Sequence, residues 1–401
     1  MRYKLPLLFS FLFILPLSSC DSSDKDPKTK MMKATQIARK IMILDSHLDV
    51  PHRLNKNPVD LSLLNTQGHF DYPRAIAGGL NVAFFAAFVP ASLQVKGGAK
   101  ESADRQIDLI SDLAHKWPDK FQVVTSTAET RKFISPDKIL LGIGIENGAA
   151  LEEDITNIDY FYNRGVRYLT LTHSKNNRIC DSSFEEIKHW QGVSPFGKQV
   201  IERMNELGIM IDVSHASDQS FWDILSISRA PVIASHSGCR TFTPDFERNL
   251  DDNMIQAIAA KGGVIQIAFG SYFLNREFNR QGEIVRRRVS EYINENKLSE
   301  GDTASEKYYE KLRSEYPAKA GNLIDLVDQI EHVVKLVGID YVGLGSDFDG
   351  ISALPEGIAD VSSYPNIIQE LLRRRYSEKD IQKICGENFL RVWSEVEKLP
   401  R

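Results

Sequence analysis

The sequence predicts an α/β protein in which eight parallel strands alternate with helices in a (β/α)8 barrel. Eight short apolar runs, rich in β-branched and aromatic residues, recur along the 401-residue chain. Most of them are apolar throughout rather than alternating, which is typical of parallel strands covered on both faces. Charged stretches with helical periodicity separate the runs, and this order favours a barrel over a doubly wound open sheet, the alternative.

The eight expected strands lie at residues 41–45, 80–89, 139–145, 166–172, 209–214, 231–235, 263–269 and 341–346. Two of the helices between them are expected over residues 194–208 and 323–338. In the first of these, Ser194 can cap the helix, Pro195 suits its first turn and Gly208 can end it.

One region interrupts the alternation of strands and helices. The chain from 273 to about 319, between the seventh and eighth strands, is rich in Glu, Lys, Arg and Tyr. We expect a charged helical insertion there. It can serve as a lid, as a subunit contact in a homodimer, or only as a solvated cover of the barrel rim.

The amino-terminal segment predicts export. A basic start precedes an apolar run over residues 5–17, which is shorter than the ~20 residues that a membrane-spanning helix needs. The following "LSSC" resembles a bacterial lipobox, so we expect a lipoprotein signal peptide over 1–19 and a lipid on Cys20. The lipid would anchor the protein to a membrane of the bacterial cell envelope; an ordinary cleaved signal is the alternative. Residues 20–35 predict a flexible tether, and 36–401 a single domain.

The overall charge excludes one class of partner. The formal net charge is −5, and the pI is near 6.0. Nucleic acids are bound by basic faces, so we expect no nucleic-acid partner.

Residues with metal-binding and acid/base chemistry follow six of the eight expected strands. They are His47 and Asp49 after the first strand, Glu146 after the third, His173 after the fourth, His215 after the fifth, His236 after the sixth and Asp347 after the eighth. In a parallel barrel these strand ends open at one face, so we expect the side chains to meet there. Imidazoles and carboxylates suit one or two Zn²⁺ ions, which can turn water into hydroxide near neutral pH. A carboxylate such as Glu146 can bridge two metals, and Asp347 can act as general base and then as proton donor.

Together these motifs resemble one family. They are "DSHLDVP", "GIGIENG", "YLTLTHS", "IDVSHAS", "PVIASHS", "RNLDDN", "GLGSDFDG" and "GENFLRVW". Their identity and order are similar to those of the membrane, or renal, dipeptidases, which are zinc peptidases of family M19 on an amidohydrolase-like (β/α)8 barrel. The resemblance covers residues 36 to 395.

The resemblance implies roles for individual residues. His47 and Asp49 would bind one zinc, His215 and His236 would bind the second, and Glu146 would bridge the two. His173 would polarise the substrate carbonyl, and Arg248 would hold the C-terminal carboxylate. Asp347 would be the acid/base group that also faces the free amine. Arg240 is the alternative to Arg248, and Asp349 the alternative to Asp347. One position departs from the family, because His52 stands where a bulky aromatic residue is expected.

The implied activity is that of a zinc-dependent dipeptidase. Its substrates would be dipeptides with a free amine and carboxylate, with tolerance of a C-terminal D-residue, attacked by a metal-bridging hydroxide. Two alternatives stay open: an amidohydrolase acting on another small amide or lactam, and a non-catalytic binding lipoprotein that keeps the barrel.

Overall fold

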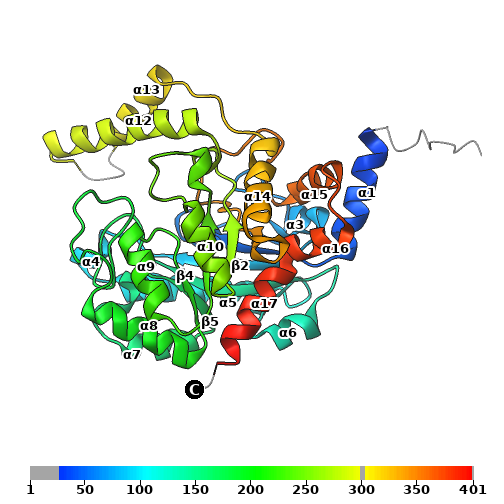
Figure 1. Cartoon of the computed structure of the whole chain (residues 1–401), viewed down its shortest axis with the longest axis horizontal. Helices are drawn as coiled ribbons and strands as arrows, with labels where there is room; N and C mark the ends of the chain where they lie inside the picture. Colours follow the sequence, from blue (N-terminus) through cyan, green and yellow to red (C-terminus); the bar gives the residue numbers. More distant parts are fainter. Residues whose placement is uncertain (1–26, 299–302, 400–401) are drawn as a thin grey trace, which may run out of the picture.

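Parallel strands form a nearly closed barrel at the centre of the protein (Figure 1). The computed structural model describes residues 27–298 and 303–399. The barrel strands pair in chain order and are β1 (Ile43–Leu48), β2 (Leu80–Phe88), β4 (Ile139–Glu146), β5 (Val166–Thr170), β6 (Met210–Asp212), β7 (Val232–Ser237), β8 (Val264–Ile267) and β9 (Val342–Leu344). A parallel bridge between Leu48 and Phe348 brings the last strand back to the first. The predicted (β/α)8 barrel is therefore confirmed.

A ninth strand, β3 (Phe121–Val123), was not expected from the sequence. It pairs only with the first half of β4, from Ile139 to Leu141, and β5 pairs with the same strand from Ile143 onward. β3 is only three residues long and has one buried side chain, so it does not form an apolar run that sequence analysis could recognise.

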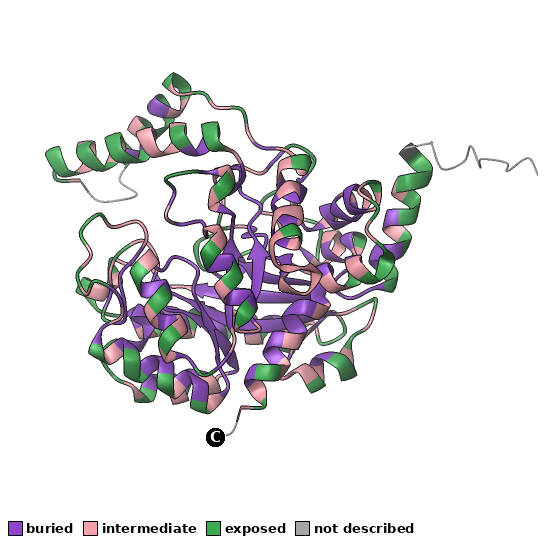
Figure 2. Ribbon diagram, in the orientation of Figure 1, coloured by how far each residue is buried: buried purple, intermediate pink, exposed green. Residues whose placement is uncertain are grey.

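Helices surround the strands, and their buried residues face the barrel (Figure 2). They are α2 (Val50–Lys56), α3 (Tyr72–Gly78), α4 (Leu93–Lys96), α5 (Ala99–Lys116), α6 (Thr127–Phe133), α7 (Thr156–Asn163), α8 (Pro195–Leu207), α9 (Asp218–Ile227), α10 (Asp252–Ala260), α14 (Leu323–Val337), α15 (Tyr364–Arg373), α16 (Glu378–Gln382) and α17 (Asn388–Glu397), with short turns η2 (Gly148–Leu151), η3 (Arg240–Phe242), η4 (Ile339–Tyr341), η5 (Val361–Ser363) and η6 (Lys383–Glu387). The two predicted helices are confirmed as α8 and α14. The Ser194 hydroxyl caps α8 by accepting from the Gly197 N–H, and Gly208 ends it in the left-handed conformation.

Large side chains fill the barrel interior at the end opposite the predicted site. Phe84 and Tyr168 pack there with Phe389 and Trp393 of α17, which closes this end. The "GIG" of β4 leaves room for them, because a Cβ on its second glycine, Gly144, would lie 2.1 Å from the Tyr168 ring. The packed floor leaves the opposite end of the barrel for chemistry.

The charged insertion is present between β8 and β9. It consists of α11 (Ser271–Leu274), α12 (Arg276–Glu295) and α13 (Thr303–Glu315), and it forms an arm beyond the barrel (Figure 1). Tyr292 stacks on Tyr308 with ring centroids 4.2 Å apart, and the Arg313 guanidinium lies 4.9 Å from the Phe278 ring centre. These contacts hold α12 and α13 together.

The structure corrects the predicted tether. Residues from 27 onward form helix α1 (Pro27–Lys40), which packs against α15 through buried Ala34, Ile37 and Ala38. The predicted signal peptide, Cys20 and the rest of the tether lie outside the described residues. None of the helices described has the length and apolarity needed to cross a membrane.

Candidate metal centre

Five side chains from four strand ends converge at the open end of the barrel. His47 lies in β1 and Asp49 directly after it, Glu146 ends β4, His215 follows β6, and His236 lies in β7. All five are buried. Residues spread over 190 positions of sequence thus meet because parallel strands present their carboxyl ends to one face.

Glu146 stands at the centre of this group. Its Oε1 lies 3.0 Å from His215 Nε2 and 3.3 Å from His236 Nε2, and its Oε2 lies 3.6 Å from His47 Nε2. On the far side, His47 Nε2 is 3.5 Å from Asp49 Oδ2. The carboxylate thus presents one oxygen to each half of the group, the placement that a bridging ligand needs.

The donor atoms fit divalent metal ions. Within the described residues, His47 Nε2 and Asp49 Oδ1 are buried without a hydrogen-bond partner. Such atoms are costly unless something binds them. One ligand atom from each of His47, Asp49 and Glu146 lies within 4.8 Å of the others, and the same holds for Glu146, His173 and His215. Nitrogen and carboxylate oxygen donors without cysteine suit zinc and its neighbours.

Burial and the local charges favour the protonation states that metal binding requires at Glu146, His215 and His236. At His47, by contrast, burial would lower the pKa, but the carboxylates of Glu146 and Asp49 raise it well above its ordinary value. Burial alone would raise the pKa of Glu146, but the neighbouring histidines, first His173 and His47, hold it well below its usual range. Burial lowers the pKa of His215 and of His236 well below the ordinary value. An ionised carboxylate and neutral imidazoles are the forms that bind metals.

Asp347 lies against this group in a restricted backbone conformation. Its φ is 62°, in the left-handed region, and its N–H donates to the His47 carbonyl at 3.0 Å. Burial and the neighbouring Asp49 carboxylate raise the pKa of Asp347 well above its usual range. Gly350 leaves room for both carboxylates, because a Cβ there would lie 2.2 Å from Asp49 Oδ2 and 2.3 Å from Asp347 Oδ1. Asp347 is thus placed to hold or release a proton beside the candidate ligands.

The alternative to Asp347 is engaged elsewhere. The Asp349 carboxylate accepts from Arg53 Nε at 2.7 Å and from the His69 N–H at 2.6 Å, and its side chain is 1% exposed. Both of its oxygens are thus engaged by Arg53 and His69, which favours Asp347 over this alternative.

Arg248 is buried beside the centre without an acidic partner. Its Nη1 donates to Ser237 Oγ at 2.7 Å and its Nη2 to the His236 carbonyl at 2.6 Å. Among the described residues no carboxylate lies within ion-pairing distance of it, and its Nε has no partner. Burial lowers the pKa of Arg248 to about 10. The alternative, Arg240, is instead saturated by the Asp218 carboxylate, at 2.6 and 2.8 Å.

His173 is the most exposed residue of the group. Its Nε2 lies 3.6 Å from Glu146 Oε1, and its side chain is 23% exposed. Phe88 packs edge-on against it with ring centroids 4.7 Å apart, and His52 packs in turn on Phe88 at 4.9 Å. His52, the residue that departs from the family motif, is therefore separated from His173 by the Phe88 ring alone, on the exposed side of the centre.

Comparison with known proteins agrees with this geometry. The model of the membrane dipeptidase family, peptidase family M19, matches residues 31–401. The chain belongs to the membrane dipeptidase family. Membership supports a metal-dependent dipeptidase, a hydrolase acting on peptide bonds.

Solved structures of similar proteins show the same fold. The probable dipeptidase PvdM from Pseudomonas aeruginosa is 29% identical with a TM-score of 0.81, and the match covers 94% of this chain and 100% of that one. A metallo peptidase from Rhodobacter sphaeroides is 23% identical with a TM-score of 0.72, covering 89% and 99%. An amidohydrolase from Pseudomonas aeruginosa is 21% identical with a TM-score of 0.68, covering 90% and 98%.

Three residues that orient the histidines of this dipeptidase-family centre were missed from the sequence. The Tyr168 hydroxyl lies 2.9 Å from His47 Nδ1, and Ser235 Oγ lies 2.8 Å from His236 Nδ1. The Ser235 hydroxyl donates a hydrogen bond to Asp212 Oδ2 at 2.6 Å, so it accepts one from His236 Nδ1–H, and His236 Nε2 is left without a proton and able to bind a metal. The sequence held one signal for these three residues, since each has a polar group and lies in a buried strand, β5, β6 or β7.

Proposed function

We propose that this chain hydrolyses the single peptide bond of dipeptides that carry a free amine and a free carboxylate. Arg248 carries the proposal. A buried guanidinium without a carboxylate partner among the described residues is costly, and a substrate carboxylate would complete it. Another small amide or lactam without a carboxylate would leave Arg248 unpaired, which disfavours that alternative.

The roles of the other side chains follow from their positions. Ser237 and the His236 carbonyl hold the Arg248 guanidinium in place for the substrate carboxylate. His173, exposed at the edge of the group, would donate a hydrogen bond to the substrate carbonyl oxygen as negative charge develops there. Asp347 would accept a proton from the attacking water and deliver it to the leaving amine.

We further propose that the centre holds two Zn²⁺ ions, with Glu146 between them. His47 and Asp49 would bind one, and His215 and His236 the other, as the two faces of the Glu146 carboxylate suggest. Bound divalent ions supply acidification of a water molecule and polarisation of the substrate carbonyl. Metal analysis of the purified protein tests the number and identity of the ions.

The two charge-binding groups would together limit substrate length. Arg248 would bind the carboxylate, and Asp347 would face the amine, with room for one peptide bond between them. A longer peptide would bury one of its charges unpaired, which is strongly unfavourable. Tolerance of a C-terminal D-residue is part of the proposal, and the Rhodobacter sphaeroides relative, liganded with a phosphinate mimic of the dipeptide L-Ala-D-Ala, supports it.

The test is amino acid release by zinc-loaded protein from matched L,L and L,D dipeptides and from tripeptides that extend each of them. We expect hydrolysis of both dipeptide series and none of the tripeptides. Equal hydrolysis of tripeptides would contradict the roles of Arg248 and Asp347. With metal bound, failure to cleave every dipeptide would overturn the proposed function.

We also propose that the protein is exported and carries a lipid on Cys20. The lipobox-like "LSSC" supports this. Fractionation of cells that express the wild type or Cys20→Ala tests it. We expect the wild type in the membrane fraction, with a lipid on Cys20 detected by mass spectrometry. A Cys20→Ala variant whose signal is cut at another position and which still stays in the membrane fraction would contradict lipidation of Cys20.

A further inference from the structure

Four aromatic side chains form a wall beside Arg248. This aromatic wall consists of Phe184, Phe246, Tyr272 and Phe273. Phe246 lies 6.1 Å from Phe184, 4.9 Å from Tyr272 and 6.2 Å from Phe273 between ring centroids. The Arg248 guanidinium carbon lies 5.2 Å from the centre of the Phe273 ring. The wall therefore adjoins the group that we propose to bind the substrate carboxylate.

Within the wall, Phe184 is the member closest to the candidate ligands. Its ring centroid lies 5.9 Å from that of His215. Phe246 and Phe273 are buried, whereas Phe184 is only partly buried. A partly exposed apolar ring beside the centre is available to contact a bound molecule, which the buried rings behind it are not.

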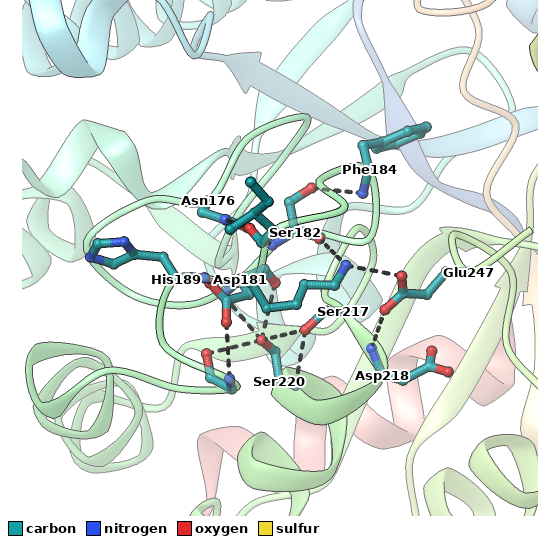
Figure 3. Close-up of polar contacts among 12 residues, drawn as sticks. Asn176, Asp181, Ser182, Phe184, His189, Ser217, Asp218, Ser220 and Glu247 are labelled. Atoms are coloured by element: carbon teal, nitrogen blue, oxygen red, sulfur yellow. Dashed lines mark hydrogen bonds and ion pairs between the residues drawn. The ribbon is translucent and has the colours of Figure 1, made fainter. Parts of the chain in front are cut away.

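The loop that carries Phe184 is held rigidly. Asp181, fully buried, accepts hydrogen bonds from the backbone N–H groups of His189, Trp190 and Gly192 at 2.8 to 3.1 Å. Figure 3 shows Phe184 pointing away from this polar network.

Further bonds tie the same loop to its neighbours. Lys188 pairs with Glu247 at 2.9 Å. Glu247 also accepts from the Asp218 N–H at 2.9 Å (Figure 3). The Ser183 N–H donates to the His215 carbonyl at 2.9 Å. Phe184 is thus fixed relative to the centre before any substrate binds.

The insertion covers the outer side of Phe184. The Arg286 guanidinium carbon of α12 lies 5.5 Å from the centre of the Phe184 ring. Its charge is paired with Glu283 at 2.5 Å. The partnered arginine adds no free positive charge at this place, so the surface around Phe184 favours apolar groups over carboxylates.

We infer that the aromatic wall contacts the side chain of the dipeptide's C-terminal residue and that Phe184 sets a preference for apolar side chains there. The inference rests on the proposed function. A residue whose carboxylate is bound by Arg248 has its side chain one carbon away from that carboxylate, next to the wall. Aromatic and branched aliphatic C-terminal residues therefore bind better than glycine or glutamate.

The test compares kcat/KM for L-Ala-L-Phe, L-Ala-L-Leu, L-Ala-L-Glu and L-Ala-Gly in the zinc-loaded protein. We expect the wild type to prefer L-Ala-L-Phe over L-Ala-Gly by about tenfold, the scale of one well-packed apolar contact. In Phe184→Ala this ratio falls toward one, and Phe184→Leu retains part of it. The matched control is Trp222→Ala, which removes an aromatic residue of α9 that is 40% exposed, and it should keep the wild-type ratio.

The outcomes separate this inference from the proposed function. A wild type that cleaves L-Ala-Gly but does not prefer L-Ala-L-Phe overturns the inference alone. A ratio that is unchanged in Phe184→Ala, or a preference for L-Ala-L-Glu, overturns it as well. A wild type that cleaves no dipeptide overturns the proposed function, and this inference with it.

Discussion

Arg53 donates from its Nε to the carboxylate of Asp349 at 2.7 Å, and this bond joins the two loops that carry Asp49 and Asp347. Arg53 lies on α2, the helix that begins directly after Asp49. Asp349 lies in the turn after β9, where both it and Asp347 have positive φ, at 70° and 62°. Residues with side chains adopt this conformation rarely, so other contacts must hold it. The Arg53–Asp349 bond is such a contact.

We predict that Arg53→Met lowers both stability and kcat. The variant leaves the buried Asp349 carboxylate without its charged partner, which costs about 3 kcal/mol of unfolding free energy. The turn is then free to move Asp347, so kcat falls by about tenfold or more with a smaller change in KM. Urea unfolding and steady-state kinetics measure both. The double variant Arg53→Met/Asp349→Asn removes the unpaired charge and should recover stability but not kcat. Unchanged kcat in Arg53→Met would show that the bond does not position Asp347.

Asp212 is predicted to act on metal affinity without touching the metal. Its Oδ2 accepts hydrogen bonds from Ser235 Oγ at 2.6 Å and Thr170 Oγ1 at 2.5 Å. In Asp212→Asn the new amide can donate to Ser235, which is then free to donate to His236 Nδ1 and place the ring proton on Nε2. We expect metal affinity to fall by about 10- to 100-fold, as for other residues that orient metal ligands. Competition with a chelator measures this, and Ser226→Ala, a surface serine, serves as the control. Wild-type affinity in Asp212→Asn would contradict the assigned tautomer.

The barrel could be predicted because each strand is an apolar run that carries its own signal. β3 could not, since its three residues are stabilised by pairing with Ile139–Leu141 and not by their own pattern. Helix α1 was missed for a related reason. Its buried apolar residues, Ala34, Ile37 and Ala38, follow a charged first turn. They form one face of the helix because they pack against α15, which lies more than 300 residues away in the sequence.

The candidate ligands were predictable because parallel topology alone gathers strand ends. Their supporting residues were not, since contacts between side chains of neighbouring strands depend on register. Thr170 meets Asp212 only because β5 and β6 pair with these two residues opposite each other. Phe184 was missed because its loop, between β5 and α8, has no periodic pattern and is fixed by polar contacts of Asp181.

Gly350 is predicted to tolerate no side chain. A methyl group there would meet both the Asp49 and the Asp347 carboxylates at 2.2 to 2.3 Å, well inside van der Waals contact. Gly350→Ala should therefore displace at least one carboxylate and reduce kcat/KM by about 100-fold, because small misplacements of reacting groups are costly. Gly321→Ala, whose added methyl would find its nearest neighbour at 3.4 Å, is the control. Near-wild-type activity in Gly350→Ala would show that neither carboxylate needs its present place.

Asp347→Asn is predicted to abolish activity while the protein keeps its metal. In the metal-free protein the same change should raise stability at neutral pH. Burial and Asp49 raise the pKa of Asp347 above its ordinary value of 3.8. The stability that Asp347 contributes is therefore complete below pH 3.8 and is lost as the pH rises through the raised pKa. Asparagine, which never ionises, avoids this loss. Urea unfolding of both metal-free proteins should show a gain at neutral pH that vanishes near pH 4. Activity that persists in the variant would refute the acid/base role.

Arg248 can be tested with substrates that differ only in the group it is proposed to bind. Arg248→Met should reduce kcat/KM for L-Ala-L-Phe by about 100-fold or more, the scale of a buried charge-assisted pair. It should change hydrolysis of the corresponding dipeptide amide little, because that substrate has no carboxylate to lose. Arg240→Met removes a neighbouring arginine that pairs with Asp218, so it should cost stability but keep the wild-type ratio of acid to amide hydrolysis. If Arg248→Met lowers both substrates equally, its guanidinium supports the His236 loop rather than the substrate, and the limit to dipeptides must arise elsewhere.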